Sequence, residues 1–215
     1  MSASVKAYFA LKMIGDTADA PHMARARQAI LDHGGAAGCN VFTRIQLALF
    51  GEVPWRAVPA MPVEIMLLPP WFPFHLEKVS YWSRTVLVPL LVLMAPRPRA
   101  RNPRGVGIAE LFTRPPEQEW RWGPPRERTF LGFAFKGLDQ ALHAAEPLMP
   151  PAPRERAIDF VLERLNGEDG LGAIYPAMAN TVMMFDVLGD RIDENDRVTA
   201  RRAVEKLLVV CDDQT

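Results

Sequence analysis

An acidic side chain in apolar surroundings is the feature of this sequence most suited to proton chemistry. Glu64 is the one charged residue between Met61 and Phe74, and a carboxyl in such a stretch can act as an acid with a raised pKa. More often, such a residue caps a helix or pairs with an arginine, here Arg44 or Arg84. We favour this structural role, so Glu64 is not assigned as a catalytic acid.

The other acidic residues have the patterns of turns and tails. Asp169 lies in the glycine-rich segment 167–172, where it is expected to shape a turn. The run 190–196 (DRIDEND) is typical of a solvated turn that caps the next helix, and Asp212 and Asp213 form a pair near the end. We therefore assign no catalytic residue to this chain.

Histidines and cysteines are too scattered to form a metal site. The four histidines have no partner at the i, i+4 spacing, and Cys39 and Cys211 have neither a C-x-x-C spacing nor a matching histidine cluster. This usage indicates a reducing compartment. The 25 acidic and 25 basic residues balance, and no phosphate-binding loop or basic-aromatic patch occurs. The sequence thus predicts no metal, no cofactor and no nucleic-acid partner.

The apolar stretch 61–95 is the element that the rest of the chain must accommodate. Its second half, from about Leu76, is predicted to be a helix kinked by Pro89, with Tyr81 and Trp82 on its apolar faces. One interpretation is a buried core helix behind a proline-rich corner. The other is a segment that lies on a membrane surface. The patch in that case comprises Met66, Leu67, Leu68, Trp71, Phe72 and Phe74.

The run 86–95 is about half of the roughly 20 residues that a membrane span requires, so 61–95 is not predicted to cross a bilayer. Between 97 and 128, two proline-rich segments are expected to be ordered loops held by Trp120 and Trp122, with a disordered linker as the alternative.

Helical periodicity dominates the remaining sequence, and no strand of convincing alternation appears. Ser4 and Asn40 are expected to cap the first and third helices. The predicted helices are Ser4 to Ile14, Pro21 to about Gly34, Val41 to Phe50, Thr129 to Glu146, Pro153 to Leu165, about Ala177 to Leu188, and Asp196 to Val210. The predicted fold is all-α.

An internal repeat indicates how the predicted helices are arranged. Three Arg-Ala pairs are each followed, at the same spacing, by two apolar residues. The copies are Arg25-Ala26 with Ile30-Leu31, Arg156-Ala157 with Val161-Leu162, and Arg202-Ala203 with Leu207-Leu208. Two copies follow a helix that ends in apolar-Gly-Asp, at 14–16 and 188–190. Such helix pairs must stack, either as an open solenoid or as a closed α/α barrel.

The segment 156–172 resembles the glutamine-tryptophan repeat of triterpene cyclases, with Leu165 in place of the glutamine and Leu171 in place of the tryptophan. Further segments follow in the order found in bacterial squalene–hopene cyclases. They are VKAYFALKMIG, VFTRIQLALFGEVPW, VEIMLL, the stretch from Trp82 to Val88, LDQALH and GEDGLGAIYP. The chain therefore resembles this family over nearly its whole length.

The resemblance implies that residues 1–215 are part of one α/α-barrel domain of a monotopic enzyme on the cytoplasmic face of the membrane. It also implies a channel with constrictions at Phe42 and Phe50, and a reaction cavity lined at Ile174, Tyr175 and Pro176. Gln46 stands near a position that is often tryptophan. The chain covers about a third of a family member, and it resembles the middle of the N-terminal half.

The family's proton donor lies in a D-x-D-D motif of the C-terminal half, and this chain contains no such motif. Three hypotheses follow. The chain is an inactive fragment of a squalene–hopene cyclase, or it is active only with a separate C-terminal half, or it is a stand-alone helical-repeat module that binds lipids or isoprenoids. The expected partners are a squalene-like isoprenoid, a membrane surface and the C-terminal half, and a homodimer remains open.

Overall fold

The computed structural model describes residues 1–72, 75–123, 137, 153–167 and 169–209. Contacts divide the chain into two compact units. Unit 1 comprises Met1–Ala60 and Arg99–Ala144, and unit 2 comprises Met61–Pro98 and Ala145–Thr215. The predicted helix at 129–146, with His143, lies outside the described residues.

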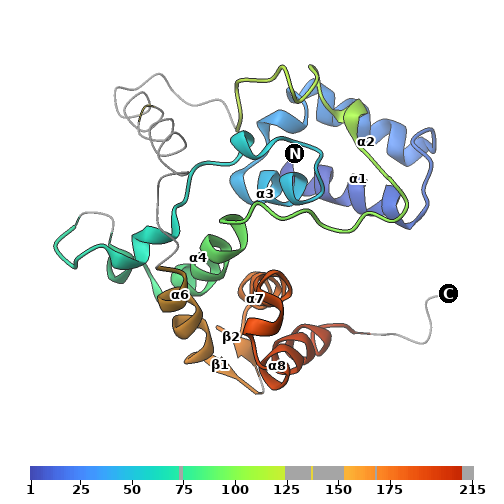
Figure 1. Ribbon diagram of the computed structural model, residues 1–215. Coiled ribbons are helices and arrows are strands. Elements are labelled where there is room, and N and C mark those ends of the chain that lie inside the picture. Colours follow the sequence, from blue (N-terminus) through green and yellow to red (C-terminus); the bar gives the residue numbers. More distant parts are fainter. Residues whose placement is uncertain (73–74, 124–136, 138–152, 168, 210–215) are drawn as a thin grey trace. The chain divides into compact units, whose positions relative to one another are not determined.

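Unit 1 is built on three helices that meet through α1 (Figure 1). They are α1 (Ser2–Ile14), α2 (Pro21–Asp32) and α3 (Val41–Leu49). On α1, Val5, Tyr8 and Phe9 are buried at the i, i+3, i+4 spacing of an amphipathic helix. Short 3₁₀ turns complete the unit at Ala36–Gly38, Trp55–Ala57 and Ala109–Leu111.

Of the two capping residues predicted for helices of unit 1, one is confirmed and one was wrong. Asn40 caps α3 as expected, since its side chain accepts a hydrogen bond from the Thr43 amide at 2.9 Å. Ser4 does not cap α1, because the helix already begins at Ser2 and Met1 is the capping position.

The loop from 99 to 123 is ordered. The Ala100 amide donates to the Leu49 carbonyl at 2.7 Å, and the Gly123 amide donates to the Ala37 carbonyl at 2.9 Å. The buried side chain of Glu119 accepts from the amides of the next two residues at 2.9 and 2.8 Å. Of the two tryptophans expected to hold this loop, Trp120 is instead 56% exposed, whereas Trp122 is half-buried with its indole nitrogen covered. Besides backbone hydrogen bonds and Glu119, side chains from the rest of unit 1 hold the loop, since Arg56 donates to the Glu117 carbonyl at 2.6 Å and Glu52 accepts from the Ile108 amide at 2.8 Å.

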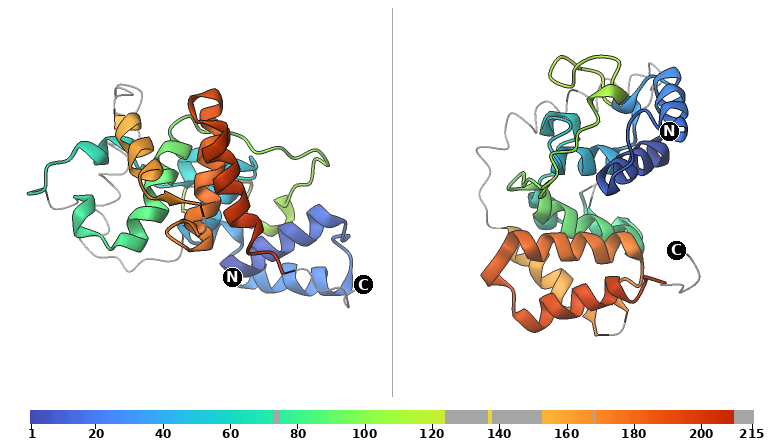
Figure 2. Two further views of the ribbon diagram at one scale, coloured as in Figure 1. Left: turned by 90° about the horizontal axis from the view of Figure 1, so that it is seen from below. Right: turned by 90° about the vertical axis from the view of Figure 1, so that its right-hand side faces the viewer.

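Unit 2 has its core where α4 packs against α6 and α7, and α7 lies beside α8 (Figures 1 and 2). These helices are α4 (Tyr81–Met94), α6 (Pro153–Leu162), α7 (Tyr175–Leu188) and α8 (Glu194–Glu205). The unit also contains 3₁₀ turns at Val63–Leu67, Leu76–Lys78 and Gly189–Arg191. Strands β1 (Leu165–Asn166) and β2 (Gly170–Leu171) form an antiparallel pair between α6 and α7.

Several predicted boundaries in unit 2 were wrong. The helix predicted from Leu76 begins at Tyr81, because the Ser80 hydroxyl accepts from the Ser83 amide and caps it there. Helix α6 ends at Leu162 because residues 165–166 turn into a strand, which the sequence did not predict. Helix α8 ends at Glu205, well before Val210.

The predicted helix–turn–helix repeat is confirmed at both places where an apolar-Gly-Asp stop occurs. Helix α1 ends at Ile14 and α2 packs against it, and α7 ends at Leu188 before α8 packs against it. In the third copy, however, Leu207 and Leu208 lie beyond the end of α8 and are 48% and 73% exposed. The prediction of an all-α fold is confirmed, with a two-residue strand pair as the one exception in the described residues.

Candidate functional site

The residues assigned to a channel lie on one face of α3. Phe42, Gln46 and Phe50 follow one another at intervals of four residues, with Phe50 at the helix C-cap. Phe42 is 51% exposed, and Phe50 is half-buried with its ring edge-on to Phe9 at a centroid distance of 5.1 Å. Phe42 and Phe50 therefore lie along one helix of unit 1, and their assignment to a channel stays a prediction.

The residues assigned to a cavity lie at the start of α7 in unit 2. Tyr175 is 63% exposed and Pro176 is exposed, whereas Ile174 packs partly against the core. Pro176 stands in the first turn, where its missing amide hydrogen costs nothing. The structure thus brings Ile174, Tyr175 and Pro176 together, and places the channel residues in the other unit.

The strand pair before α7 orients this segment. Leu165 is paired with Leu171, and Asn166 with Gly170. Leu171 is fully buried, and Leu165 is packed against the same core. Apolar packing of these two leucines therefore holds the turn.

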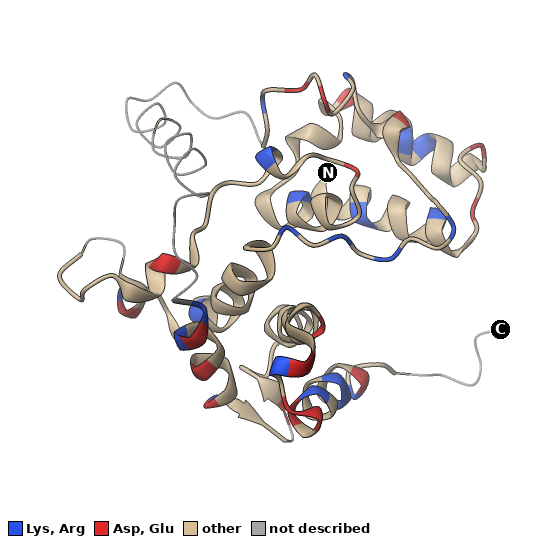
Figure 3. Cartoon of the chain, in the orientation of Figure 1, with Lys and Arg blue, Asp and Glu red and all other residues tan. Residues whose placement is uncertain are grey.

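The patch assigned to a membrane surface forms an irregular edge of unit 2. Leu67 and Trp71 are 51% and 77% exposed, while Met66 packs partly against the core. The rings of Trp71 and Phe72 lie edge-on at 6.0 Å. Leu68 is half-buried, and Phe74 lies outside the described residues. The stretch 61–72 contains one charged residue, Glu64, and most of its ribbon is drawn in the tan of uncharged residues in Figure 3.

Two further aromatic residues extend the list of exposed apolar positions. Tyr81 and Trp82, which the sequence placed on the apolar faces of a longer helix, are 42% and 52% exposed in the first turn of α4. Their rings lie edge-on at 5.6 Å. The cap at Ser80 was the sequence signal that could have predicted their exposure. A helix that begins just after Ser80 has Tyr81 and Trp82 in its first turn.

Two acidic segments have the structural surroundings expected of them, whereas the expected cap or arginine pair of Glu64 stays a prediction, and Asp212 and Asp213 lie outside the described residues. Asp193 caps α8 by accepting from the Asn195 amide at 2.8 Å, and the Asp169 amide donates to Asn166 Oδ1 at 2.6 Å within the turn. Glu64 is half-buried in the 3₁₀ turn Val63–Leu67. Within the part of the chain that is described, no group of three or more His, Cys, Asp or Glu side chains could hold a metal ion.

A titratable cluster that the sequence did not predict ties α1 to the turn Ala109–Leu111. Glu110 Oε1 accepts from the Tyr8 hydroxyl at 3.0 Å and from Lys12 Nζ, and Lys12 Nζ also donates to the Gly107 carbonyl at 2.6 Å. Burial and the Glu110 carboxylate raise the pKa of Tyr8 to about 12. Burial alone would raise the pKa of Glu110, but the hydrogen bonds from Lys12 and Tyr8 outweigh it and lower that pKa.

Replacing Glu110 with glutamine is expected to destabilise unit 1 at neutral pH by about 1 kcal/mol, because Lys12 loses its charged partner. The lowered pKa of Glu110 gives the wild type a stabilisation that is present above the ordinary carboxyl pKa of 4.5 and is lost as the pH falls through the lower, folded-state value. Below this pH, the difference in unfolding free energy between the wild type and the E110Q chain should therefore be smaller than at neutral pH. Urea unfolding at a series of pH values measures this difference, and parallel pH profiles would contradict it.

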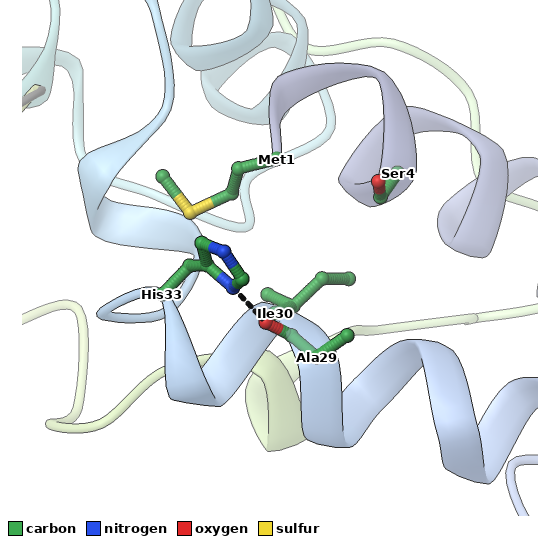
Figure 4. A pocket seen from close by; sticks show the side chains of 5 residues that line it. All are labelled: Met1, Ser4, Ala29, Ile30 and His33. Atoms are coloured by element: carbon green, nitrogen blue, oxygen red, sulfur yellow. Dashed lines mark hydrogen bonds between the residues drawn. The ribbon is translucent and has the colours of Figure 1, made fainter.

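A small pocket in unit 1 lies between α1 and α2 (Figure 4). It is lined by Met1, Ser4, Ala29, Ile30 and His33. The ring nitrogen Nδ1 of His33 donates to the Ala29 carbonyl oxygen at 2.7 Å, so this nitrogen is already engaged. None of the residues assigned to a channel, a cavity or a membrane patch lines this pocket. In the described part of the chain, no helix combines the length and hydropathy needed to cross a bilayer.

Comparison with known proteins identifies close relatives. Residues 1–213 match the family model described as the squalene-hopene cyclase N-terminal domain. The chain is 57% identical over its whole length to the squalene–hopene cyclase of Bradyrhizobium diazoefficiens, of which it covers 33%. It is 59% identical over 98% of its length to that of Zymomonas mobilis, covering 32%, and 50% identical over 98% to that of Schizosaccharomyces japonicus, covering 33%. The chain thus spans about a third of the length of these curated relatives.

Proposed function

The chain belongs to the squalene–hopene cyclase family, and from this premise we propose that it forms part of an enzyme that cyclises a squalene-like isoprenoid to a hopanoid. The observation that carries the proposal is the match of residues 1–213 to the family's N-terminal domain, together with 57% identity to an enzyme of that name. The α/α-barrel class follows from the same match. That residues 1–215 lie within one such domain stays a prediction.

In this proposal the chain supplies surfaces for the substrate, and another part of the enzyme supplies the acid. Cyclisation begins when a strong carboxylic acid protonates a terminal alkene in a dry cavity, and the resulting cation adds to successive double bonds. Loss of a proton or addition of water ends the cascade. Since the sequence contains no D-x-D-D motif, we assign the proton donor to the C-terminal half and expect the chain alone to be inactive.

Phe42 and Phe50 are proposed to line the substrate channel, and Ile174, Tyr175 and Pro176 the cavity wall. The exposure of Phe42, Tyr175 and Pro176 supports this assignment, because side chains that face a substrate must not be covered by their own core. An aromatic face can stabilise a nearby cation by up to about 2 kcal/mol when it is desolvated. The ring of Tyr175 is suited to that role.

The exposed Leu67 and Trp71 support attachment to a membrane surface, from which a water-insoluble isoprenoid would enter. We propose a monotopic arrangement on the cytoplasmic face. The exposure of Leu67 and Trp71 also favours a second candidate function, a stand-alone helical-repeat module that binds lipids or isoprenoids without turnover. Such a module would need the exposed apolar side chains but no catalytic acid.

The test is to incubate the purified chain with squalene in mild detergent, with and without the C-terminal half of a homologous cyclase, and to analyse the products by gas chromatography–mass spectrometry. We expect hopene or hopanol only when the C-terminal half is added. Product from the chain alone would contradict the assignment of the acid and direct attention to Glu64 and Asp169. Absence of product in both samples would favour the binding module.

A further inference from the structure

The buried polar side chains of unit 2 gather where α4 meets α7. Among the described residues of this unit, they are Thr85 on α4, and Asn180 and Thr181 on α7. The core around them is apolar, so each polar group needs a hydrogen-bond partner. Thr181 finds its partner within its own helix, where its hydroxyl donates to the Ala177 carbonyl at 2.8 Å. Asn180 instead reaches across to α4.

Asn180 binds α4 at the turn that a proline disturbs. Its Nδ2 donates to the Val86 carbonyl oxygen at 3.1 Å. Three residues later, Pro89 has no amide hydrogen, so the carbonyl of Thr85 loses its helical partner and the helix is weakened there. The Thr85 hydroxyl donates to the Trp82 carbonyl at 2.9 Å. Side chains therefore reinforce this part of α4, and one of them belongs to α7.

The turn before α7 fits tightly against the same part of α4. Gly172 has a φ of +68°, and a Cβ atom placed on it would lie 2.8 Å from the Thr85 hydroxyl oxygen. A larger residue would push the turn away from α4. The contacts at Gly172 and Asn180 thus lie on either side of the segment 174–176 and fix both of its ends.

We propose that Asn180 is a positioning residue, whose bond to the Val86 carbonyl sets the register of α7 on α4 and thereby places Ile174, Tyr175 and Pro176 against the substrate. This inference rests on the proposed function, in which these three residues line the cavity. If α7 slid along α4, the Asn180 amide would be buried without its acceptor, which is costly. A single buried asparagine fixes the register of coiled coils for the same reason.

Hydrogen exchange on the 215-residue chain tests the register without requiring turnover. The amides of Ala177 and Met178 both donate to the Ile174 carbonyl at 3.1 Å, so their exchange reports on the first turn of α7. Asn180→Leu keeps a similar volume and removes the bond, and we expect these amides to exchange about tenfold faster. Thr181→Val is the matched control, because it removes another buried polar group, whose hydroxyl donates to a carbonyl of its own helix. This control should change the exchange rate less than about twofold.

The second readout is the product mixture formed from squalene in the presence of the C-terminal half. Asn180→Leu should raise the share of incompletely cyclised products several-fold, and Thr181→Val should leave that share unchanged. Unchanged exchange in the Asn180→Leu chain would overturn the register assignment. An unchanged product mixture would overturn the link to the substrate.

Two controls keep these outcomes separable. If Asn180→Leu prevents cooperative unfolding, Asn180→Ala replaces it, because a smaller side chain removes the bond without crowding the core. If the wild-type chain forms no product with the C-terminal half, the proposed function fails and the substrate part of this inference fails with it. The exchange measurement still decides whether Asn180 sets the register of α7.

Discussion

Replacing Gly170 with alanine is expected to destabilise unit 2 by about 2–5 kcal/mol. Gly170 has a φ of +64°, which disfavours any residue with a Cβ atom. An added Cβ would lie 2.6 Å from the Cβ of Ala203 on α8 and 3.3 Å from Met178 Cγ on α7. The change therefore combines backbone strain with a steric clash against two helices. Urea unfolding followed by far-UV circular dichroism measures the loss.

The neighbouring Gly167 provides the matched control. Among the described residues, no atom lies within 4 Å of a Cβ placed there, so Gly167→Ala should change the stability by less than about 0.5 kcal/mol. Adding Ala203→Gly to Gly170→Ala should relieve the clash and leave only the backbone strain. The double variant should thus be more stable than the sum of the single changes indicates. Equal stability of the Gly167→Ala and Gly170→Ala chains would contradict the packing of β2 against α8.

Replacing both Leu67 and Trp71 with glutamate is expected to reduce binding to lipid vesicles by at least about a hundredfold. These side chains are 51% and 77% exposed on an edge of unit 2 that carries few charges. Transfer of one such side chain from water to an apolar layer contributes about 1.5–3 kcal/mol, so losing two removes most of the driving force. Cosedimentation with vesicles that contain anionic and zwitterionic lipids, over a range of lipid concentrations, gives the partition coefficients.

Ile14 is the matched control for this experiment. It is 76% exposed at the end of α1, close to the 77% of Trp71, so Ile14→Glu adds one carboxylate, half the charge added by the double variant, at an exposed apolar position outside the patch. Its vesicle binding should stay within about twofold of the wild type. Equal losses for Ile14→Glu and for the double variant would show general hydrophobic adsorption, which would contradict a defined membrane patch.

Local signals made much of this fold predictable. Asn40 and the glycine stops at 15 and 189 set helix ends through hydrogen bonds and turns within a few residues. Where two local signals competed, the prediction was wrong. The apolar pattern after Leu76 continued smoothly into α4, and it hid the cap at Ser80 that starts the helix.

The remaining errors depend on contacts that periodicity does not encode. Strands β1 and β2 have two residues each, which is too short for an alternating pattern, and they form because Leu171 is buried between α7 and α8. The Asn180 bond to α4 joins residues 94 positions apart. The assignments of Phe42, Phe50 and Ile174 to a channel and a cavity came from the family resemblance, because their types alone are those of ordinary core residues.

The most direct test of the account is to map where a substrate analogue contacts the chain. A squalene analogue with a photoreactive diazirine would be irradiated with the chain and the C-terminal half, and the labelled residues identified by mass spectrometry. We expect labels at Ile174, Tyr175 and Pro176, with weaker labels at Phe42 and Phe50, all suppressed by excess squalene. Labels confined to the pocket at His33, or spread over the surface and insensitive to squalene, would contradict the claim that this chain forms the channel and cavity wall of a cyclase.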